Sequence, residues 1–242
     1  MSDISRYLRQ LKDRYGETLY LEKQILREAE LAAQGLAEEG GTVTEAWNTA
    51  RTLAQLDEMI CHCVKCPLSE TRNRFVFGVG NPKADVVLVG EAPGAEEDRQ
   101  GEPFVGRAGK LLDKILEAVD FKREDVFICN ILKCRPPNNR DPLPAEVEQC
   151  EPYLHKQLAL LKPKVMLALG RIAAQTLLRS NESLTRLRAE THSYQGIPLI
   201  VTYHPAALLR NPNWKRPTWE DVQKFRALYD ERMAAAAKGG GA

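Results

Sequence analysis

The chain has 242 residues and a formal net charge of +1, and 43% of its residues are hydrophobic. This length suits one α/β domain with an appendage better than two full domains, and the apolar fraction excludes wholesale disorder. A nucleic-acid partner would have to bind a local basic surface, because the protein as a whole is not basic. No apolar run is long enough for a membrane helix, and residues 1–10 lack the apolar stretch of a signal peptide. We therefore expect a soluble, cytoplasmic protein with no membrane partner.

Residues 1–57 are highly charged, and their apolar residues recur at helical spacing. They predict a helical N-terminal extension, interrupted by glycines at residues 40–41. The extension shows no residues that indicate chemistry, and we expect it to pack on the main domain or on a partner. At the other end, residues 234–242 are of low complexity and are expected to form a flexible tail.

Residues 58–233 alternate short apolar runs with helical patterns, which is typical of a three-layer α/β/α fold with a mainly parallel central sheet. The apolar runs predict four buried strands, at residues 84–89, 125–132, 165–169 and 197–202. Helices are expected at residues 109–119, 145–161, 171–178 and 219–233. Polar motifs come directly after predicted strands, where open α/β sheets bind their ligands.

A long glycine-rich motif follows the first predicted strand. It begins with residues 90–94 (GEAPG) and ends with residues 101–109 (GEPFVGRAG). It lacks the Gly-x-x-x-x-Gly-Lys-Ser/Thr pattern of a phosphate-binding loop. Phe104 lies in this loop, where it either packs on the core or remains available to a ligand.

Asn130 ends the second predicted strand and opens the motif NILKCRPP. Burying its amide is costly unless the amide finds hydrogen-bond partners. The side chain therefore either caps a turn or binds a ligand. Its donor and acceptor stand side by side, which suits the edge of a pyrimidine.

The third motif, residues 204–212 (HPAALLRNP), follows the fourth predicted strand. A single histidine in this position is more often structural than catalytic. Leu208 and Leu209, followed by Arg210, form an apolar tip in an otherwise polar loop. Such tips insert into DNA in place of an extruded base, and the alternative is that both leucines pack on the core.

The six cysteines are unevenly spaced: a close group, a distant pair and a single residue, namely Cys61, Cys63, Cys66, Cys129, Cys134 and Cys150. An even count does not imply disulfides in a chain without an export signal, because the cytosol keeps thiols reduced. A tight pair combined with distant single cysteines is typical of a metal or iron–sulfur site built from several segments.

The three motifs in this order, with cysteines at Cys63-x-x-Cys66, Cys134 and Cys150, resemble the family 4 uracil-DNA glycosylases of bacteria and archaea. The resemblance covers roughly residues 60 to 230. It implies a monofunctional DNA glycosylase that hydrolyses the N-glycosidic bond of deoxyuridine, releases free uracil and leaves an abasic site for base excision repair. The implied partner is uracil-containing DNA, single- or double-stranded, and we expect the enzyme to be a monomer.

The resemblance also implies a [4Fe–4S] cluster held by the four cysteines just named. Thiolates are the usual ligands, and four irons offer four external sites. Cys61 could compete with Cys63, but the two-residue gap to Cys66 favours Cys63. Cys129 is expected to be a small buried residue. The cluster is expected to be structural, because base excision requires no electron.

The same resemblance assigns the substrate site to six residues: Glu91, Ala92 and Pro93 line the pocket, Phe104 stacks on uracil, Asn130 binds its N3 and O4 edge, and His204 faces O2. Bond cleavage leaves negative charge on uracil and an oxocarbenium-like sugar, so the site must stabilise the anion and bring water to the sugar. We expect Glu91, Asn130 and His204 to be catalytic, with Glu91 positioning water or offsetting the sugar's charge. Hydrogen-bonding of its own turn is the alternative for Glu91, and Glu97 and Asp98 lie nearby.

Basic residues gather near the second and third motifs and after the third strand, and we expect some of them to grip phosphates: Lys133, Arg135, Arg140, Arg171, Arg179, Arg186, Arg188, Arg210, Lys215 and Arg216.

Three other functions remain open. A relative that traps uracil-DNA covalently is disfavoured, because Ala92 stands where that group has glutamine and the run from Gly106 passes into a helix without a basic insertion. A non-catalytic DNA-binding module is disfavoured by the presence of Asn130 and His204. Preference for a deaminated purine is disfavoured by Phe104 with Asn130, which suit a pyrimidine.

Overall fold

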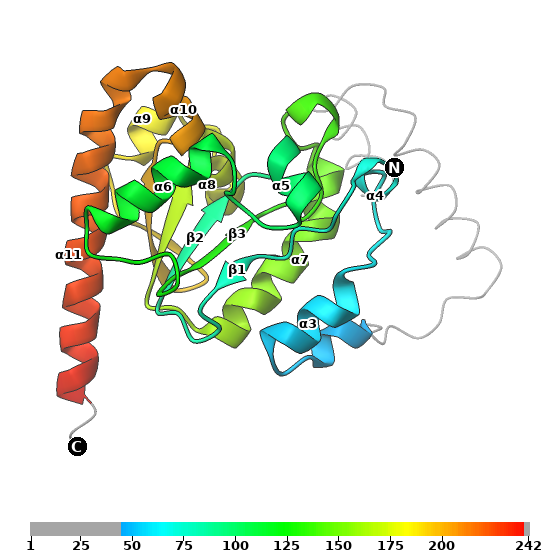
Figure 1. The fold of residues 1–242 in the computed structure, drawn as a ribbon. Coiled ribbons are helices and arrows are strands. Elements are labelled where there is room, and N and C mark those ends of the chain that lie inside the picture. Colours follow the sequence, from blue (N-terminus) through cyan, green and yellow to red (C-terminus); the bar gives the residue numbers. More distant parts are fainter. Residues whose placement is uncertain (1–44, 240–242) are drawn as a thin grey trace, which may run out of the picture. The chain divides into compact units, whose positions relative to one another are not determined.

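The computed structural model describes residues 45–239, which contain the helices and strands of Figure 1. Six strands form one sheet: β1 (Val79–Gly80), β2 (Val86–Gly90), β3 (Phe127–Asn130), β4 (Val165–Leu169), β5 (His192–Tyr194) and β6 (Ile197–Thr202). The α-helices are α3 (Leu53–Ile60), α4 (Leu68–Thr71), α5 (Ala95–Gln100), α6 (Arg107–Glu117), α7 (Pro144–Leu161), α8 (Arg171–Leu178), α9 (Leu184–Leu187), α10 (Pro205–Arg210) and α11 (Lys215–Gly239). Three short 3-10 helices are η1 (Ala46–Thr49), η2 (Pro137–Asn139) and η3 (Pro212–Trp214). None of these helices is long and apolar enough to cross a membrane.

The sheet has the order β1-β3-β2-β4-β6-β5. Strands β3, β2, β4 and β6 are parallel to one another, while β1 and β5 pair antiparallel at the two edges. The four parallel strands are those predicted, and the mainly parallel sheet is confirmed. The edge strands have two and three residues, too few for an alternating apolar pattern to be recognised.

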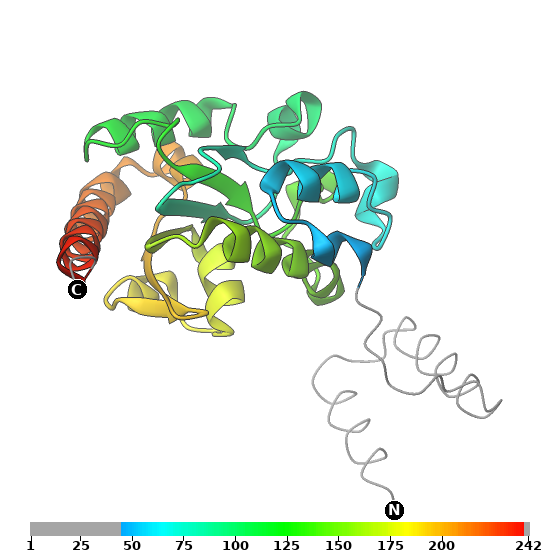
Figure 2. The ribbon, with the colours of Figure 1, turned by 90° about the horizontal axis from the view of Figure 1, so that it is seen from below.

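Helices cover both faces of the sheet, which gives the three-layer α/β/α arrangement (Figure 2). Strand residues alternate between the faces, so Val87 and Val89 pack with α3, α7, α8 and α9. Val86 and Leu88 point the other way and pack with α6 and α11. Strands buried on both faces explain why the predicted runs are continuously apolar.

The predicted N-terminal boundary at residue 57 falls inside α3. Leu56 and Ile60 of this helix are fully buried and belong to the same core as the sheet. The compact unit of the described residues begins at Ala46. The helices predicted before residue 44 lie outside the described residues.

The flexible tail predicted from residue 234 stays a prediction, and its first residues lie in helix α11. Helix α11 continues to Gly239 and includes the run of alanines at residues 234–237. Alanine has the highest intrinsic helix propensity, so a low-complexity alanine run extends an existing helix.

Candidate active site

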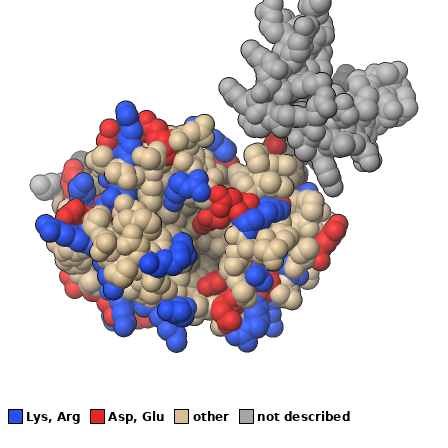
Figure 3. Space-filling model, turned by 90° about the horizontal axis from the view of Figure 1, so that it is seen from above, with Lys and Arg blue, Asp and Glu red and all other residues tan. Residues whose placement is uncertain are grey.

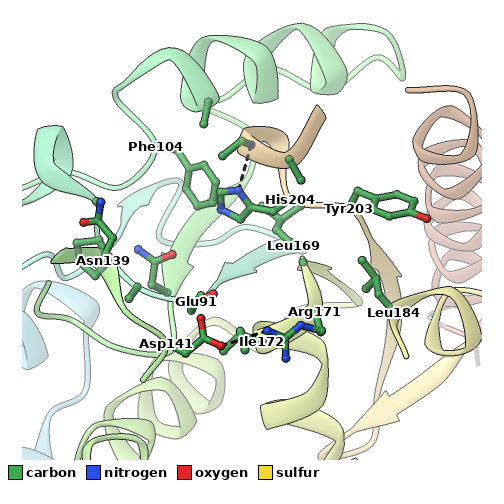
Figure 4. A pocket seen from close by; sticks show the side chains of 18 of the residues that line it. Glu91, Phe104, Asn139, Asp141, Leu169, Arg171, Ile172, Leu184, Tyr203 and His204 are labelled. Atoms are coloured by element: carbon green, nitrogen blue, oxygen red, sulfur yellow. Dashed lines mark hydrogen bonds and ion pairs between the residues drawn. The ribbon is translucent and has the colours of Figure 1, made fainter. Parts of the chain in front are cut away.

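The carboxyl ends of all four parallel strands surround one pocket with a volume of about 700 Å³ (Figure 4). Glu91 follows β2, Asn130 ends β3, Arg171 follows β4, and His204 follows β6. The six residues predicted to bind the base all line this pocket: Glu91, Ala92, Pro93, Phe104, Asn130 and His204. Seen from above, the molecule is hollowed, and both basic and acidic side chains border the hollow (Figure 3).

Asn130 is buried, with only 2% of its surface exposed, and its neighbour across the sheet is Gly90. A Cβ atom at Gly90 would lie 2.3 Å from the Asn130 Oδ1 and 2.9 Å from the Phe104 Cζ. Glycine at this position therefore lets the amide and the aromatic ring approach the end of β2. The Asn130 side-chain amide makes no hydrogen bond to another described residue, so it is available to a ligand.

Phe104 has a left-handed backbone conformation, with φ of 54°. Its loop is held by Glu97, whose Oε1 accepts hydrogen bonds from the N–H groups of Val105 (3.1 Å) and Gly106 (3.2 Å). Gly109 allows the helix α6 to pack under the loop, because a Cβ there would lie 1.7 Å from the Phe104 carbonyl oxygen. The loop thus fixes the Phe104 ring beside His204, with the ring centroids 5.3 Å apart (Figure 4).

His204 is the N-cap residue of α10, and its Nδ1 accepts a hydrogen bond of 3.1 Å from the backbone N–H of Ala206. Because Nδ1 is the acceptor, a neutral ring must carry its proton on Nε2. Burial, together with the smaller effect of the nearby Arg210 cation, lowers the pKa of His204 to about 4. At neutral pH the residue is therefore an uncharged imidazole with an Nε2–H donor.

Glu91 lies in the pocket near the ion pair of Arg171 and Asp141, whose nitrogen and oxygen are 3.1 Å apart (Figure 4). The pKa of Glu91 is raised to about 7, mainly by burial and also by the Asp141 carboxylate, while Arg171 opposes the shift. The carboxyl group thus titrates near neutral pH.

The two acidic residues named as alternatives to Glu91 have structural partners. Glu97 holds the Phe104 loop, as described above. Asp98 is 1% exposed and accepts hydrogen bonds from the backbone N–H and the side-chain amide of Asn73. Of the acidic candidates in the motif, Glu91 is therefore the one whose carboxyl group remains available in the pocket.

The two predicted wedge leucines differ in exposure. Leu208 is buried, with 1% of its surface exposed, and Leu209 is 41% exposed. Both lie on α10, where successive side chains point about 100° apart, so one faces the interior and the other faces solvent. The structure therefore does not bring Leu208 to the surface, while Leu209 and Arg210 remain exposed.

Two of the predicted phosphate-binding residues are buried in hydrogen-bonded networks. Lys133 is fully buried, and its Nζ donates to the backbone oxygen of Asn130 (2.8 Å) and to the Gln157 Oε1 (2.6 Å). Arg188 forms an ion pair with Asp221 in which both side chains are nearly inaccessible. Neither can reach a phosphate in this structure.

Most of the remaining basic candidates form ion pairs with acidic residues, namely Arg140 with Glu146, Arg171 with Asp141, Arg179 with Glu151, Arg186 with Glu182 and Arg216 with Glu220. Arg210 and Lys215 are exposed and have no ion-pair partner within residues 45–239. These two cations, close to α10, are the ones most free to bind phosphate.

The four predicted cluster cysteines lie on three segments that meet: the stretch between α3 and α4, the loop after β3, and helix α7. Three of their sulfur atoms accept hydrogen bonds of 3.2 Å, at Cys134 from Arg72, at Cys150 from the Lys133 N–H and at Cys63 from the Tyr153 hydroxyl. The pKa of Cys134 is raised to about 11 and that of Cys150 to about 12, mainly by burial; neighbouring cysteines contribute to both shifts, while Arg72 opposes the first and Lys133 the second. Within residues 45–239, no group of three cysteine, histidine, aspartate or glutamate side chains is arranged so that it could hold a single metal ion.

The two cysteines left over have other surroundings. Cys129 is buried in β3, in the apolar core, and Cys61 is the C-cap residue of α3, where its thiol donates to the backbone oxygen of Glu58.

Two pairings in the pocket have no signal in the sequence. The Arg171–Asp141 pair joins the start of α8 to the loop before α7, and Tyr203 stacks on Trp214 with centroids 4.9 Å apart. Each pair is brought together by the fold from segments that are apart in the chain, so no local spacing predicts it.

Residues 77–223 match the uracil DNA glycosylase superfamily. With its α/β/α fold and its pocket at the carboxyl ends of the strands, the chain belongs to this superfamily.

Within the superfamily, the chain is similar to type-4 uracil-DNA glycosylases. It is 45% identical to the one from Archaeoglobus fulgidus over 72% of this chain and 92% of the relative. Identity is 46% with the enzyme of Pyrobaculum aerophilum and 41% with that of Thermotoga maritima, each over 72% of this chain and 92% of the relative. These similarities place the chain in the type-4 family.

Proposed function

We propose that the protein is a monofunctional uracil-DNA glycosylase, which hydrolyses the N-glycosidic bond of deoxyuridine in DNA and leaves an abasic site. The observation that carries the proposal is the convergence of Phe104, Asn130 and His204 in one pocket of a type-4 family member. An aromatic ring, a free amide and a neutral imidazole donor are the groups needed to hold a pyrimidine by its face and its edges.

Uracil binding follows from the chemistry of these side chains. Phe104 provides the apolar surface on which the base stacks, and Ala92 and Pro93 line the pocket. The Asn130 amide accepts from N3–H and donates to O4, and cytosine would offer the opposite pattern of donors and acceptors at these positions. Burial of Asn130 without a protein partner makes a mismatched base costly, because the amide would then remain unpaired.

His204 stabilises the leaving group. As the glycosidic bond breaks, negative charge develops on uracil and reaches O2. The Nε2–H of His204 donates to this oxygen, and the donor is fixed in advance by the bond from Ala206 N–H to Nδ1. No proton needs to be transferred, because the pKa of His204 is lowered to about 4 and the ring remains neutral.

Glu91 acts on the sugar side of the reaction. A carboxyl group with a pKa of about 7 is ionised in a large part of the molecules at neutral pH and can accept a proton from water. As a carboxylate it positions the attacking water and offsets the positive charge of the oxocarbenium-like sugar. Arg171 and Asp141 adjust the balance between the two protonation states.

The DNA strand is held near α10. Leu209 is the exposed apolar side chain that enters the space vacated by the extruded nucleotide, and Arg210 and Lys215 bind phosphates. Leu208 does not take part, since it is packed against the interior.

Cys63, Cys66, Cys134 and Cys150 are proposed to hold a [4Fe–4S] cluster. The residues fit this group, because four thiols from three segments meet and three of the sulfurs accept hydrogen bonds, as cluster ligands do. When bound, the cluster would tie the segment before α4 and the loop after β3 to α7, and the reaction itself would proceed on the other side of that loop.

The cysteine assignment predicts a change in colour. Cys134→Ser is expected to lose most of the absorbance at roughly 400 nm that arises from thiolate-bound iron, together with most of the bound iron. Cys61→Ser should keep both, because its thiol lies outside the proposed ligand set. Absorbance and iron content of the two variants, purified side by side, are the measurements; equal iron in both would contradict the assignment.

The proposed activity is tested with uracil-containing oligonucleotides, single- and double-stranded, incubated with the purified protein and then treated with alkali. Strand scission at the uracil, with free uracil in solution, is the expected result. A shifted band that survives detergent would instead indicate a covalent trap. A detergent-sensitive shift without scission would indicate a DNA-binding module, and either outcome would overturn the proposal.

A further inference from the structure

The pocket extends well beyond the groups that hold uracil. Its volume of about 700 Å³ lies in the range of about 300–1,000 Å³ that pockets offer to drug-sized ligands, which are larger than one pyrimidine ring. The lining continues past His204 to Tyr203, Leu184 and Trp214. Figure 4 shows Tyr203 on the far side of His204 from Phe104, so this second part of the pocket is separate from the proposed uracil position.

A column of stacked groups forms this second part. The Tyr203 ring lies against the Trp214 indole, with centroids 4.9 Å apart and planes inclined by 8°. The Arg188 guanidinium covers Tyr203 at 4.5 Å from the ring centroid. Arg188 is itself fixed by Asp221 through bonds of 2.6 and 2.9 Å, and Asp221 also accepts from the Thr202 hydroxyl. The column is therefore anchored at a buried end, where Arg188 and Asp221 are 11% and 3% exposed.

Trp214 is the outer end of this column. It is half-buried and lines the pocket, whereas Arg188 closes the inner end. Its place in the chain is between the exposed cations Arg210 and Lys215, which have no ion-pair partner among residues 45–239. A flat aromatic surface with free cations nearby in the chain has the chemistry that binds a nucleobase and its phosphates.

We propose that Trp214 is a stacking subsite for a base that neighbours the deoxyuridine on the same strand. The inference rests on the proposed function, and it adds a determinant of substrate choice. His204 and Tyr203 are consecutive residues that present their rings to different parts of the pocket, so a base on Trp214 accompanies uracil and does not replace it. Because a neighbouring base must leave its own stack to reach Trp214, the subsite favours single-stranded or locally opened DNA.

The subsite is tested by removing the neighbouring base from the substrate. Single-stranded oligonucleotides carry one deoxyuridine with an abasic analogue directly before it, directly after it, or at neither position, and kcat/KM for uracil release is measured. Loss of the stacked base is expected to lower kcat/KM about 10-fold for one of the two positions, in line with base–aromatic stacking. Trp214→Ala should lower kcat/KM for the intact strand by a similar factor and then show no further loss with the abasic substrate.

Two variants control the experiment. Trp219→Ala removes an indole that is 42% exposed on α11 and does not line the pocket, and it should behave like the unchanged protein. Trp214→Phe keeps an aromatic ring and should retain most of the dependence on the neighbouring base. This variant keeps the proposal testable if the alanine variant fails to fold.

The inference is overturned if the unchanged protein is insensitive to both abasic positions, or if Trp214→Ala keeps the full sensitivity. These results differ from failure of the proposed function, in which the unchanged protein would release no uracil from any of the strands.

Discussion

Replacing His204 with alanine is expected to lower kcat about 10²- to 10³-fold, which corresponds to the loss of one donor to a developing oxyanion. The ring donates a hydrogen bond from its Nε2–H to O2 of uracil, and the proposed mechanism assigns this role to no other described residue of the pocket. The measurement is single-turnover release of uracil from a single-stranded oligonucleotide at saturating enzyme. Activity close to that of the unchanged protein would overturn the assignment.

His204 also caps α10, so its replacement has a structural effect that must be separated from the catalytic one. Loss of an N-cap costs about 0.5–2 kcal/mol of unfolding free energy. His204→Asn keeps a capping oxygen for the Ala206 N–H but shortens the side chain and removes the imidazole. We expect this variant to unfold at nearly the same urea concentration as the unchanged protein and to remain strongly impaired in catalysis. Recovery of activity together with stability would show that capping, and not the Nε2–H donor, is what the reaction needs.

The central fold could be predicted because its signal is local. Each parallel strand is buried on both faces and is therefore apolar throughout, and the helices between them keep helical spacing. Lys133 shows where such reasoning fails. A lysine is ordinarily exposed, yet this one lies between Leu132 and Cys134, both buried, and its ammonium is satisfied by an amide oxygen of α7 that no local pattern reveals.

The site could be predicted to the extent that its residues follow strands. Asn130 and His204 meet because the carboxyl ends of parallel strands share one edge of the sheet. The exposure of the two leucines could have been predicted more sharply, since proline favours the first position of a helix and Pro205 therefore indicates that a helix begins there. On a helix, Leu208 and Leu209 cannot both face solvent from the same side. The Tyr203–Trp214 stack depends on how η3 meets the end of β6, which is a tertiary contact.

The second large effect is expected at Glu91. Glu91→Gln should lower kcat about 10²- to 10⁴-fold at pH 8, the range that a positioned general base contributes. For the unchanged protein, activity should rise with pH through a midpoint near 7, because the pKa of Glu91 is raised to about 7 and the ionised form is the active one. The variant should be low throughout and lack this midpoint. Glu117→Gln, which alters an exposed carboxylate on α6 away from the pocket, is the matched control.

The raised pKa of Glu91 also predicts how stability depends on pH: stability should fall as pH rises, whereas activity should rise. Between the ordinary pKa of 4.5 and the folded value of about 7, the folded protein holds a proton that the unfolded chain has released, so the unfolding free energy falls as pH rises. At about 1.4 kcal/mol per pKa unit, ionised Glu91 costs the folded state at most about 3.5 kcal/mol above pH 7, and screening by solvent lowers this cost because the carboxylate is only partly buried. Glu91→Gln should therefore unfold at higher urea concentration than the unchanged protein at pH 8, and at nearly the same concentration at pH 4.5. A variant that loses activity without gaining stability at pH 8 would show that folding does not disfavour ionisation of the Glu91 carboxyl group. The pH midpoint of activity would then have to come from another residue.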